Sequence, residues 1–109
     1  MAYSQSLAER IRLAFANRRG ITEKKMFGGV GFLLHGNMCV GVWKNSLIVR
    51  LGIDQAEAAL KQPNVGEFDI TGKPMKGWVM VEPDGLETDE QLGFWTQQAL
   101  EFVSTLPKK

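Results

Sequence analysis

The chain has 109 residues, the length of one domain, and we predict a single domain over residues 1–109. Apolar residues make up 44% and charged residues 23%, as is typical of soluble globular proteins. The formal net charge of +1 provides no bulk attraction to nucleic acid or to an anionic membrane. One cysteine excludes an intrachain disulfide framework, and with one histidine it leaves the usual zinc sites short of ligands. We therefore expect no metal and no cofactor.

An amphipathic helix is predicted at the start of the chain. Its apolar face follows the spacing of one helical side and consists of Leu7, Ile11, Ala14 and Phe15. Ser6 and Glu9 have the spacing of a capping box, and Ser4 is a rival cap. Residues 1–6 contain no apolar core of a signal peptide, and no apolar run reaches the ~20 residues of a membrane span. A lone thiol fits a reducing compartment, so we expect a cytoplasmic protein with no membrane contact.

The hydrophobic period changes to two in the middle third. Three short apolar runs, separated by His35-Gly36-Asn37 and Lys44-Asn45, predict an antiparallel meander. An edge strand over Thr22–Phe27 is expected before it, because Lys24 and Lys25 discourage pairing with another chain. In the second run, alternation places Met38 with Val40 and Val42 on one face. The opposite sheet face is predicted to carry Cys39, Trp43, Ile48 and Arg50.

The last third contains a short helix, two strands and a final helix. The short helix is predicted to begin at Asp54, which has the capping spacing with Glu57, and to end before Pro63. Glu67–Ile70 and Gly77–Val81 are the predicted strands. The final helix is capped by Thr88 with Gln91. Its apolar stripe consists of Leu92, Trp95, Ala99, Phe102, Val103 and Leu106.

The predicted order is helix, three or four strands, helix, two strands, helix. Hairpin-length connections require antiparallel pairing, and helices on one face bury both helical stripes, so the expected class is α+β in two layers. A sheet face that holds Trp43 and Ile48 is then a candidate homodimer surface.

Charge is unevenly distributed. Residues 1–25 hold six Lys and Arg against two Glu, whereas residues 82–101 hold six Asp and Glu and no Lys or Arg. The simpler interpretation is two solvated helix faces that attract each other. The alternative is a surface that docks a partner of opposite charge.

The residues capable of chemistry do not form a catalytic set. Gly28-Gly29-Val30-Gly31 precedes a strand, whereas phosphate cradles need a following helix, so a glycine bend or bulge is favoured. His35 lies in a turn without an orienting carboxylate, and Cys39 has no neighbour that would lower its pKa. We therefore predict that the protein is not an enzyme.

Two polar features remain. Arg50 stands in an apolar strand, where it is expected to pair with Asp69 or Glu67, or else to bind an anion or a partner. Lys73, Lys76 and Trp78 combine positive charge with an aromatic ring, which is a weak form of a single-stranded nucleic-acid site.

Several segments resemble one known family, the TfoX/Sxy N-terminal domain. They are Met26-Phe27-Gly28-Gly29, His35-Gly36-Asn37-Met38, Leu47-x-Val49-Arg50 and Asp69-x-Thr71-Gly72-x-Pro74-Met75-x-Gly77. The resemblance covers nearly the whole chain. It implies a fold similar to type III secretion chaperones, α-β(3)-α-β(2)-α, and a link to DNA-uptake competence through transcription regulation. It brings no catalytic residues. The chain ends before the helical C-terminal domain of full-length members, so we do not expect it to bind DNA directly.

The leading hypothesis is a non-enzymatic interaction or regulatory module with a protein partner, which could include a second copy of the chain. The expected contact residues are Trp43, Ile48, Arg50, Lys73, Lys76 and Trp78. One alternative is a small-molecule binder or enzyme with a pocket near Arg50, Asp69 and Lys76. Another is a weak nucleic-acid binder that uses residues 1–25 with Lys73 and Lys76.

Overall fold

The computed structural model describes residues 3–26, 28–69 and 75–108. Its helices are α1 (Gln5–Ala14), α2 (Ile53–Ala59) and α3 (Asp89–Val103), with a short 3-10 helix η1 (Pro83–Gly85). Its strands are β1 (Ile21–Met26), β2 (Gly29–Leu34), β3 (Asn37–Trp43), β4 (Ser46–Arg50), β5 (Val65–Glu67) and β6 (Trp78–Val81). The fold is therefore α+β, and the elements follow one another in the predicted order.

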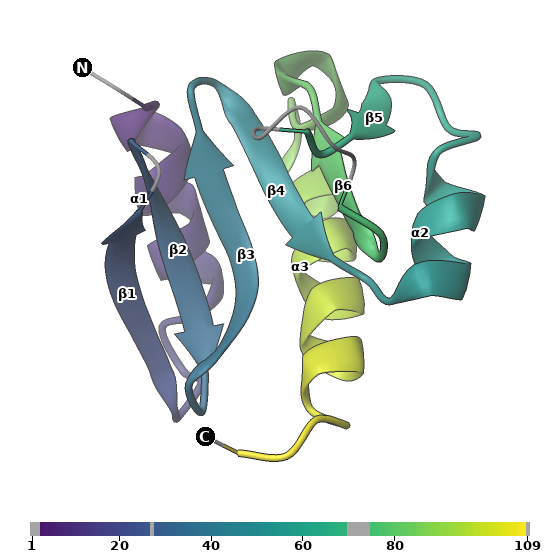
Figure 1. The fold of residues 1–109 in the computed structure, drawn as a ribbon. Helices are drawn as coiled ribbons and strands as arrows, with labels where there is room; N and C mark the ends of the chain where they lie inside the picture. Colours follow the sequence, from purple (N-terminus) through teal and green to yellow (C-terminus); the bar gives the residue numbers. More distant parts are fainter. Residues whose placement is uncertain (1–2, 27, 70–74, 109) are drawn as a thin grey trace.

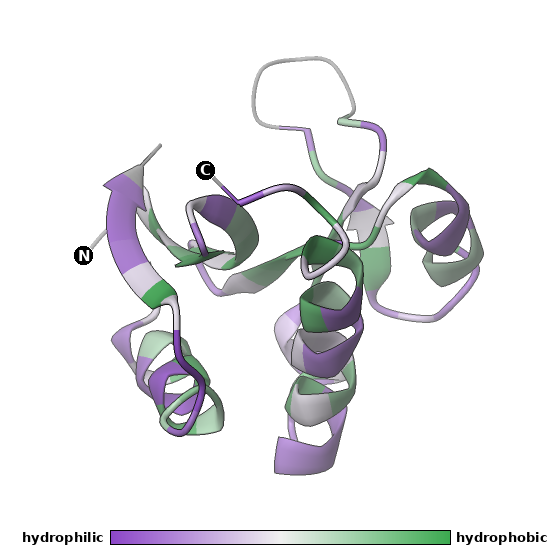
Figure 2. Ribbon diagram, turned by 90° about the horizontal axis from the view of Figure 1, so that it is seen from below, coloured by the Kyte–Doolittle hydropathy of each residue, from purple (hydrophilic) through white to green (hydrophobic). Residues whose placement is uncertain are grey.

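The six strands form one antiparallel sheet in the order β1-β2-β3-β4-β6-β5, with β1 on the edge as predicted. Both long helices pack on one side of it: α1 contacts β3, α3 contacts β3 and β4, and the two helices contact each other. Figure 1 shows α1 and α3 behind the strands, and Figure 2 shows the sheet from below. The short helix α2 packs against β6, at the opposite end of the sheet from β1.

The hydrophobic core lies between α1, α3 and the sheet face that they cover. Alternate strand residues meet there in cross-strand pairs such as Phe32 with Val40, and the ring of Phe15 from α1 meets Phe32 edge-on at 6.2 Å. Each such side chain contributes about 1.5–3 kcal/mol when it is fully buried. The other sheet face, here called the open face, carries Leu33, Met38, Gly41, Trp43, Ile48 and Met80, and at the end of β4 also Arg50 with its partner Trp78.

A β-bulge between β2 and β3 changes which side chains enter the core. Phe32 pairs with Val40, but the next residue, Leu33, pairs with Met38, so Cys39 is an extra residue on β3. Cys39 consequently lies in the core beside Val40 with 0% exposure, and Met38 lies on the open face. The sheet faces predicted for Cys39 and Met38 were therefore wrong, because the prediction assumed uninterrupted alternation, whereas β3 contains an inserted residue.

The start of α1 is fixed by Ser4 and not by Ser6. The Oγ of Ser4 accepts a hydrogen bond from the Leu7 N–H at 3.1 Å. The Ser4 N–H donates to the Lys44 carbonyl at 2.7 Å, which holds Ser4 outside the helix and leaves Ser6 within the first turn. The predicted capping box at Ser6 was therefore wrong. Ala14, expected on the buried face, is the last helical residue and is exposed.

The predicted cap of α3 is confirmed. Thr88 Oγ1 accepts from the Gln91 N–H at 3.1 Å, and Gln91 Oε1 accepts from the Thr88 N–H at 2.9 Å. These reciprocal bonds form a capping box and satisfy two backbone donors at the helix start. The buried side of α3 extends from Leu92 to Val103, while Phe102 is only half-buried.

Two other predicted boundaries differ from the structure. Helix α2 begins at Ile53 with Gly52 at its N-cap and no side-chain cap, so Asp54 lies inside the first turn. Strand β5 ends at Glu67, where the predicted strand Glu67–Ile70 begins, and Ile70 lies outside the described residues. Both predictions relied on local composition, whereas contacts with distant parts of the chain determine these boundaries.

The basic and acidic segments attract each other, as the simpler interpretation of the charge pattern predicted. Arg10 Nη2 of α1 lies 3.4 Å from Asp89 Oδ1 at the start of α3. Arg12 pairs with Glu23 and with Glu9 at 2.9 Å each, and these hydrogen bonds, that to Glu23 first, raise the pKa of Arg12. Exposed ion pairs of this kind contribute little to the free energy of unfolding, so they affect the orientation of α1 more than its stability.

The two serines at the start of α1 provide a matched test of its cap. We expect Ser4→Ala to lower the free energy of unfolding by about 1 kcal/mol, because the Leu7 N–H loses its acceptor. Ser6→Ala, inside the helix, should change it by less than about 0.5 kcal/mol, because alanine is a good helix former. Urea denaturation followed by circular dichroism measures both values. Equal losses in the two variants would contradict the assignment of the cap.

The buried thiol provides a second prediction. Burial raises the pKa of Cys39 to about 12. The unfolded thiol has a pKa of about 8.5, so the folded state gains stability from this group below that pH and loses it as the pH rises further. We expect the native thiol to be inert to Ellman's reagent at pH 8 and to react fully in urea.

Leu13→Cys is the matched control, because Leu13 is 71% exposed on α1. Its new thiol should react at once in the native protein. Rapid reaction of Cys39 in the folded wild type would contradict its position in the core.

Candidate functional site

The last residue of β4, Arg50, has its guanidinium packed against two aromatic rings. Its Cζ lies 5.3 Å from the ring centroid of Trp78 and 6.0 Å from that of Phe102. Trp78 is the cross-strand partner of Arg50 on β6, and Phe102 comes from α3, so the sheet and a helix both position the cation. The expected pairing with Asp69 or Glu67 is wrong: none of the ion pairs among the described residues involves Arg50.

A cavity of about 490 Å³ adjoins this guanidinium. Arg50, Lys76 and Asp54 contribute its charged groups, and Trp78, Phe102 and Ile53 its apolar walls. The structure thus brings together three of the predicted site residues, Arg50, Lys76 and Trp78. Asp69 is exposed and is not among the lining residues. Two cationic groups beside aromatic surface favour an anion with an apolar part.

Two glycines hold the walls of this cavity together. The Gly77 carbonyl accepts hydrogen bonds from the N–H groups of Leu51 at 2.8 Å and Gly52 at 3.1 Å. Both glycines have positive φ, +85° at Gly52 and +88° at Gly77, which other L-residues adopt at a cost. A Cβ at Gly52 would lie 2.7 Å from the Phe102 ring. The backbone itself therefore joins the end of β4 to the start of β6.

An apolar groove of about 310 Å³ continues from the cavity along α2. The two share Ile53, Lys76, Gly77 and Trp78. Ile53, Leu60 and Met75 line the groove and are 56%, 37% and 40% exposed. Glu57 and Glu67 also line it, so its rim is acidic. Sequence reasoning missed this groove, because its apolar residues come from α2 and from the segment at the start of β6, which only the packing of α2 against β6 brings together.

The other predicted contact residues lie elsewhere. Trp43 ends β3 next to the β3–β4 turn, where Lys44 Nζ lies 4.6 Å from its ring centroid. Its partner Ser46 is four residues from Arg50 along β4, which corresponds to about 13 Å. Ile48 lies between them and is only 2% exposed. Lys73 lies outside the described residues. The described members of the predicted set therefore lie along one sheet face, with Trp43 near the β3–β4 turn and Arg50 with Trp78 at the other end of β4.

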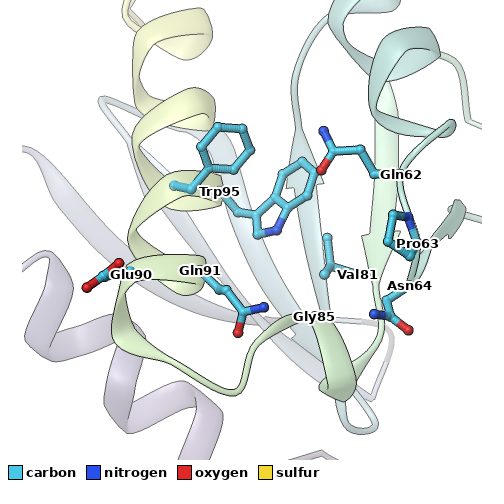
Figure 3. A pocket seen from close by; sticks show the side chains of 9 residues that line it. Gln62, Pro63, Asn64, Val81, Gly85, Glu90, Gln91 and Trp95 are labelled. Atoms are coloured by element: carbon cyan, nitrogen blue, oxygen red, sulfur yellow. The ribbon is translucent and has the colours of Figure 1, made fainter.

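A further cavity, of about 400 Å³, lies between α3, η1 and the segment before β5 (Figure 3). Trp95 and Val81 form its floor, and the half-exposed Phe94 meets Trp95 edge-on at 5.0 Å. Its polar wall consists of Gln62, Asn64, Glu90 and Gln91. Among these lining residues only Glu90 carries a charge, so the cavity offers no attraction to anions.

No cluster of three or more His, Cys, Asp or Glu side chains suited to a metal ion occurs in the part of the chain that the structure describes.

His35 has a φ of 51° in the turn between β2 and β3, and its ring lies against Gly20. Gly29 is needed where β2 approaches β3, because a Cβ there would lie 2.1 Å from the Val42 carbonyl oxygen. This close strand approach agrees with a structural role for the glycine-rich segment.

Within the described ranges, none of the helices has the length and apolar character needed to span a membrane.

Comparison with known proteins assigns the family. No curated protein and no solved structure matched the chain. The family described as the TfoX N-terminal domain matches residues 14–103, which extend from the end of α1 to the end of α3 and include Arg50, Lys76 and Trp78. The chain therefore belongs to the TfoX N-terminal domain family.

Proposed function

We propose that this protein is a non-enzymatic, cytoplasmic interaction module that acts in competence or transcription regulation through protein–protein contact. Membership of the TfoX N-terminal domain family supports the regulatory part of this proposal. The proposal includes a two-layer α+β arrangement similar to type III secretion chaperones, with one side of the sheet used for packing and the other for a partner. The observation that carries the contact part is the composition of the open face.

The open face is apolar without being covered by a helix. Leu33, Met38, Trp43 and Met80 are each half-buried there, around the fully buried Ile48. Figure 1 shows the described helices behind or beside the strands and none across their front. Apolar surface of this kind on a small domain is typical of interaction sites. Trp43, with Lys44 over its ring, has the amphipathic character common among residues that dominate binding energy.

A second copy of the chain is the partner we consider first. Gly31 lies opposite Gly41 across β2 and β3, and the Met38 side chain covers Gly41, so the surface that a partner would meet here is the apolar side chain of Met38. Two such faces packed together would remove Trp43 and Met38 of both copies from water. This gain is the hydrophobic driving force expected for a homodimer.

Trp43→Ser tests the homodimer. Light scattering after size exclusion should give twice the mass of one chain for the wild type and the mass of one chain for the variant, because the variant loses the half-buried indole ring of Trp43. Leu13→Ser, which removes an exposed apolar side chain from α1, is the matched control and should remain dimeric. A monomeric wild type at high concentration would rule out this dimer.

A protein partner other than the chain itself is tested by capture from native lysate. The wild type and Leu13→Ala should retain the same protein, and Trp43→Ala should retain at least tenfold less, as expected for loss of about 2 kcal/mol at a dominant contact. Arg50→Ala shows whether the end of the sheet belongs to the same contact. Equal capture by the wild type and Trp43→Ala would contradict the open face as the binding surface.

A second candidate function is the binding of a small molecule. The observation that favours it is the joint lining of one cavity by Arg50 and Lys76 beside Trp78. This site is separate from Trp43, so the two functions can coexist.

A further inference from the structure

The guanidinium of Arg50 lies over two aromatic rings. Trp78 and Phe102 lie at 5.3 Å and 6.0 Å from its Cζ. Aromatic rings stack on the flat face of a guanidinium, whereas carboxylates bind in its plane through paired N–H donors. Since no described ion pair involves Arg50, the side chain is held in place while its donors remain available.

The surroundings of Arg50 favour an anion of low charge. Lys76 lines the same cavity and adds a second cation, while Asp54 opposes it from the start of α2. Further along the groove, the charged lining residues among those that the structure describes are Glu57, Glu67 and Lys76. An anionic group is therefore attracted at the Arg50 end, and a second negative charge on the same molecule would be repelled along the groove.

The groove beside the cations is suited to an apolar group. Ile53 and Met75 are 56% and 40% exposed there, and Trp78 forms part of both the cavity and the groove. Adjoining volumes of about 490 Å³ and 310 Å³ are in the range of sites that hold small molecules. A ligand that covers these side chains gains the hydrophobic contribution of the area it removes from water.

We propose that this paired cavity and groove binds a small amphipathic monocarboxylate. The carboxylate is held in the plane of the Arg50 guanidinium and near the Lys76 ammonium, and the uncharged body lies over Trp78, Ile53 and Met75. The hydrogen bonds from Leu51 and Gly52 to the Gly77 carbonyl fix the walls before the ligand arrives, which lowers the entropy cost of binding. This inference deepens the second candidate function, and its site lies at the opposite end of β4 from Trp43.

The probe is 3-phenylpropanoate, titrated into the labelled wild-type protein and followed by amide and indole N–H signals in NMR. We expect a dissociation constant on the order of 1 mM, with shifts at Arg50, Lys76 and the Trp78 indole, while the buried indole of Trp95 serves as an internal reference. The uncharged 3-phenylpropanamide and inorganic phosphate should each bind about tenfold more weakly, because one lacks the charge and the other lacks the apolar body. Equal binding of the acid and either of these compounds would refute the proposal, as would the absence of shifts at these residues.

Removal of a positive charge and removal of a negative charge from the cavity should change the affinity for 3-phenylpropanoate in opposite directions. Lys76→Met should weaken 3-phenylpropanoate binding about threefold, and Asp54→Asn should strengthen it about threefold, as expected for single charges near a partly solvated anion. Lys24→Met and Asp84→Asn are matched controls on β1 and η1 and should leave the affinity unchanged. Equal effects of Lys24→Met and Lys76→Met would show that only the overall charge matters, which would overturn the proposal.

Arg50→Gln should weaken binding about tenfold, because it removes the paired donors. Since Arg50 also packs on two rings, this variant is interpreted only where its melting temperature matches that of the wild type; otherwise the affinities of Lys76→Met and Asp54→Asn decide.

Trp43→Ser separates this site from the proposed dimer: it should abolish dimerisation and retain full binding of 3-phenylpropanoate. Loss of ligand binding in Trp43→Ser would contradict two independent sites.

Discussion

The burial of one face of an antiparallel sheet by two helices is the constraint on which the rest of this structure depends. The stripes of α1 and α3 meet β3 and β4, so the central strands must present large apolar residues to the helices. Phe32, Leu47 and Val49 meet this demand, with at most 1% exposure each. The chain uses its long amphipathic elements on this side only. The open face is the direct result, and its half-buried residues are the surface on which the proposed protein contact depends.

Much of this architecture could be predicted from local pattern. The change from a helical period to alternation, the lysines of β1 and the Thr88 capping box each depend on residues close in sequence, and each was confirmed. The bulge at Cys39 could not be predicted, because it is defined by the residue opposite on β2. Ser4 prevails over Ser6 for the same reason: its backbone pairs with Lys44, forty residues later.

The candidate site shows the same division between local and long-range information. Arg50, Lys76 and Trp78 could be singled out, because a cation in an apolar strand and a basic-aromatic cluster are unusual as residue types. The partner assigned to Arg50 was wrong, since two rings take the place expected of a carboxylate. Phe102, Gly52 and the groove along α2 were missed, because only the packing of α3 and the turn at Gly77 bring them to the end of β4.

A buried amide binds the segment after α3, in addition to the packing of Leu106 against the core. Asn37 is 4% exposed, and its Nδ2 donates to the Pro107 carbonyl at 2.8 Å. A buried amide that loses its acceptor costs about 1–3 kcal/mol, so the residues that follow α3 cannot detach freely. Because Asn37 begins β3, fraying of the segment after α3 is energetically coupled to the β2–β3 hairpin. This hydrogen bond thus connects the segment after α3 to the start of β3, seventy residues earlier in the sequence.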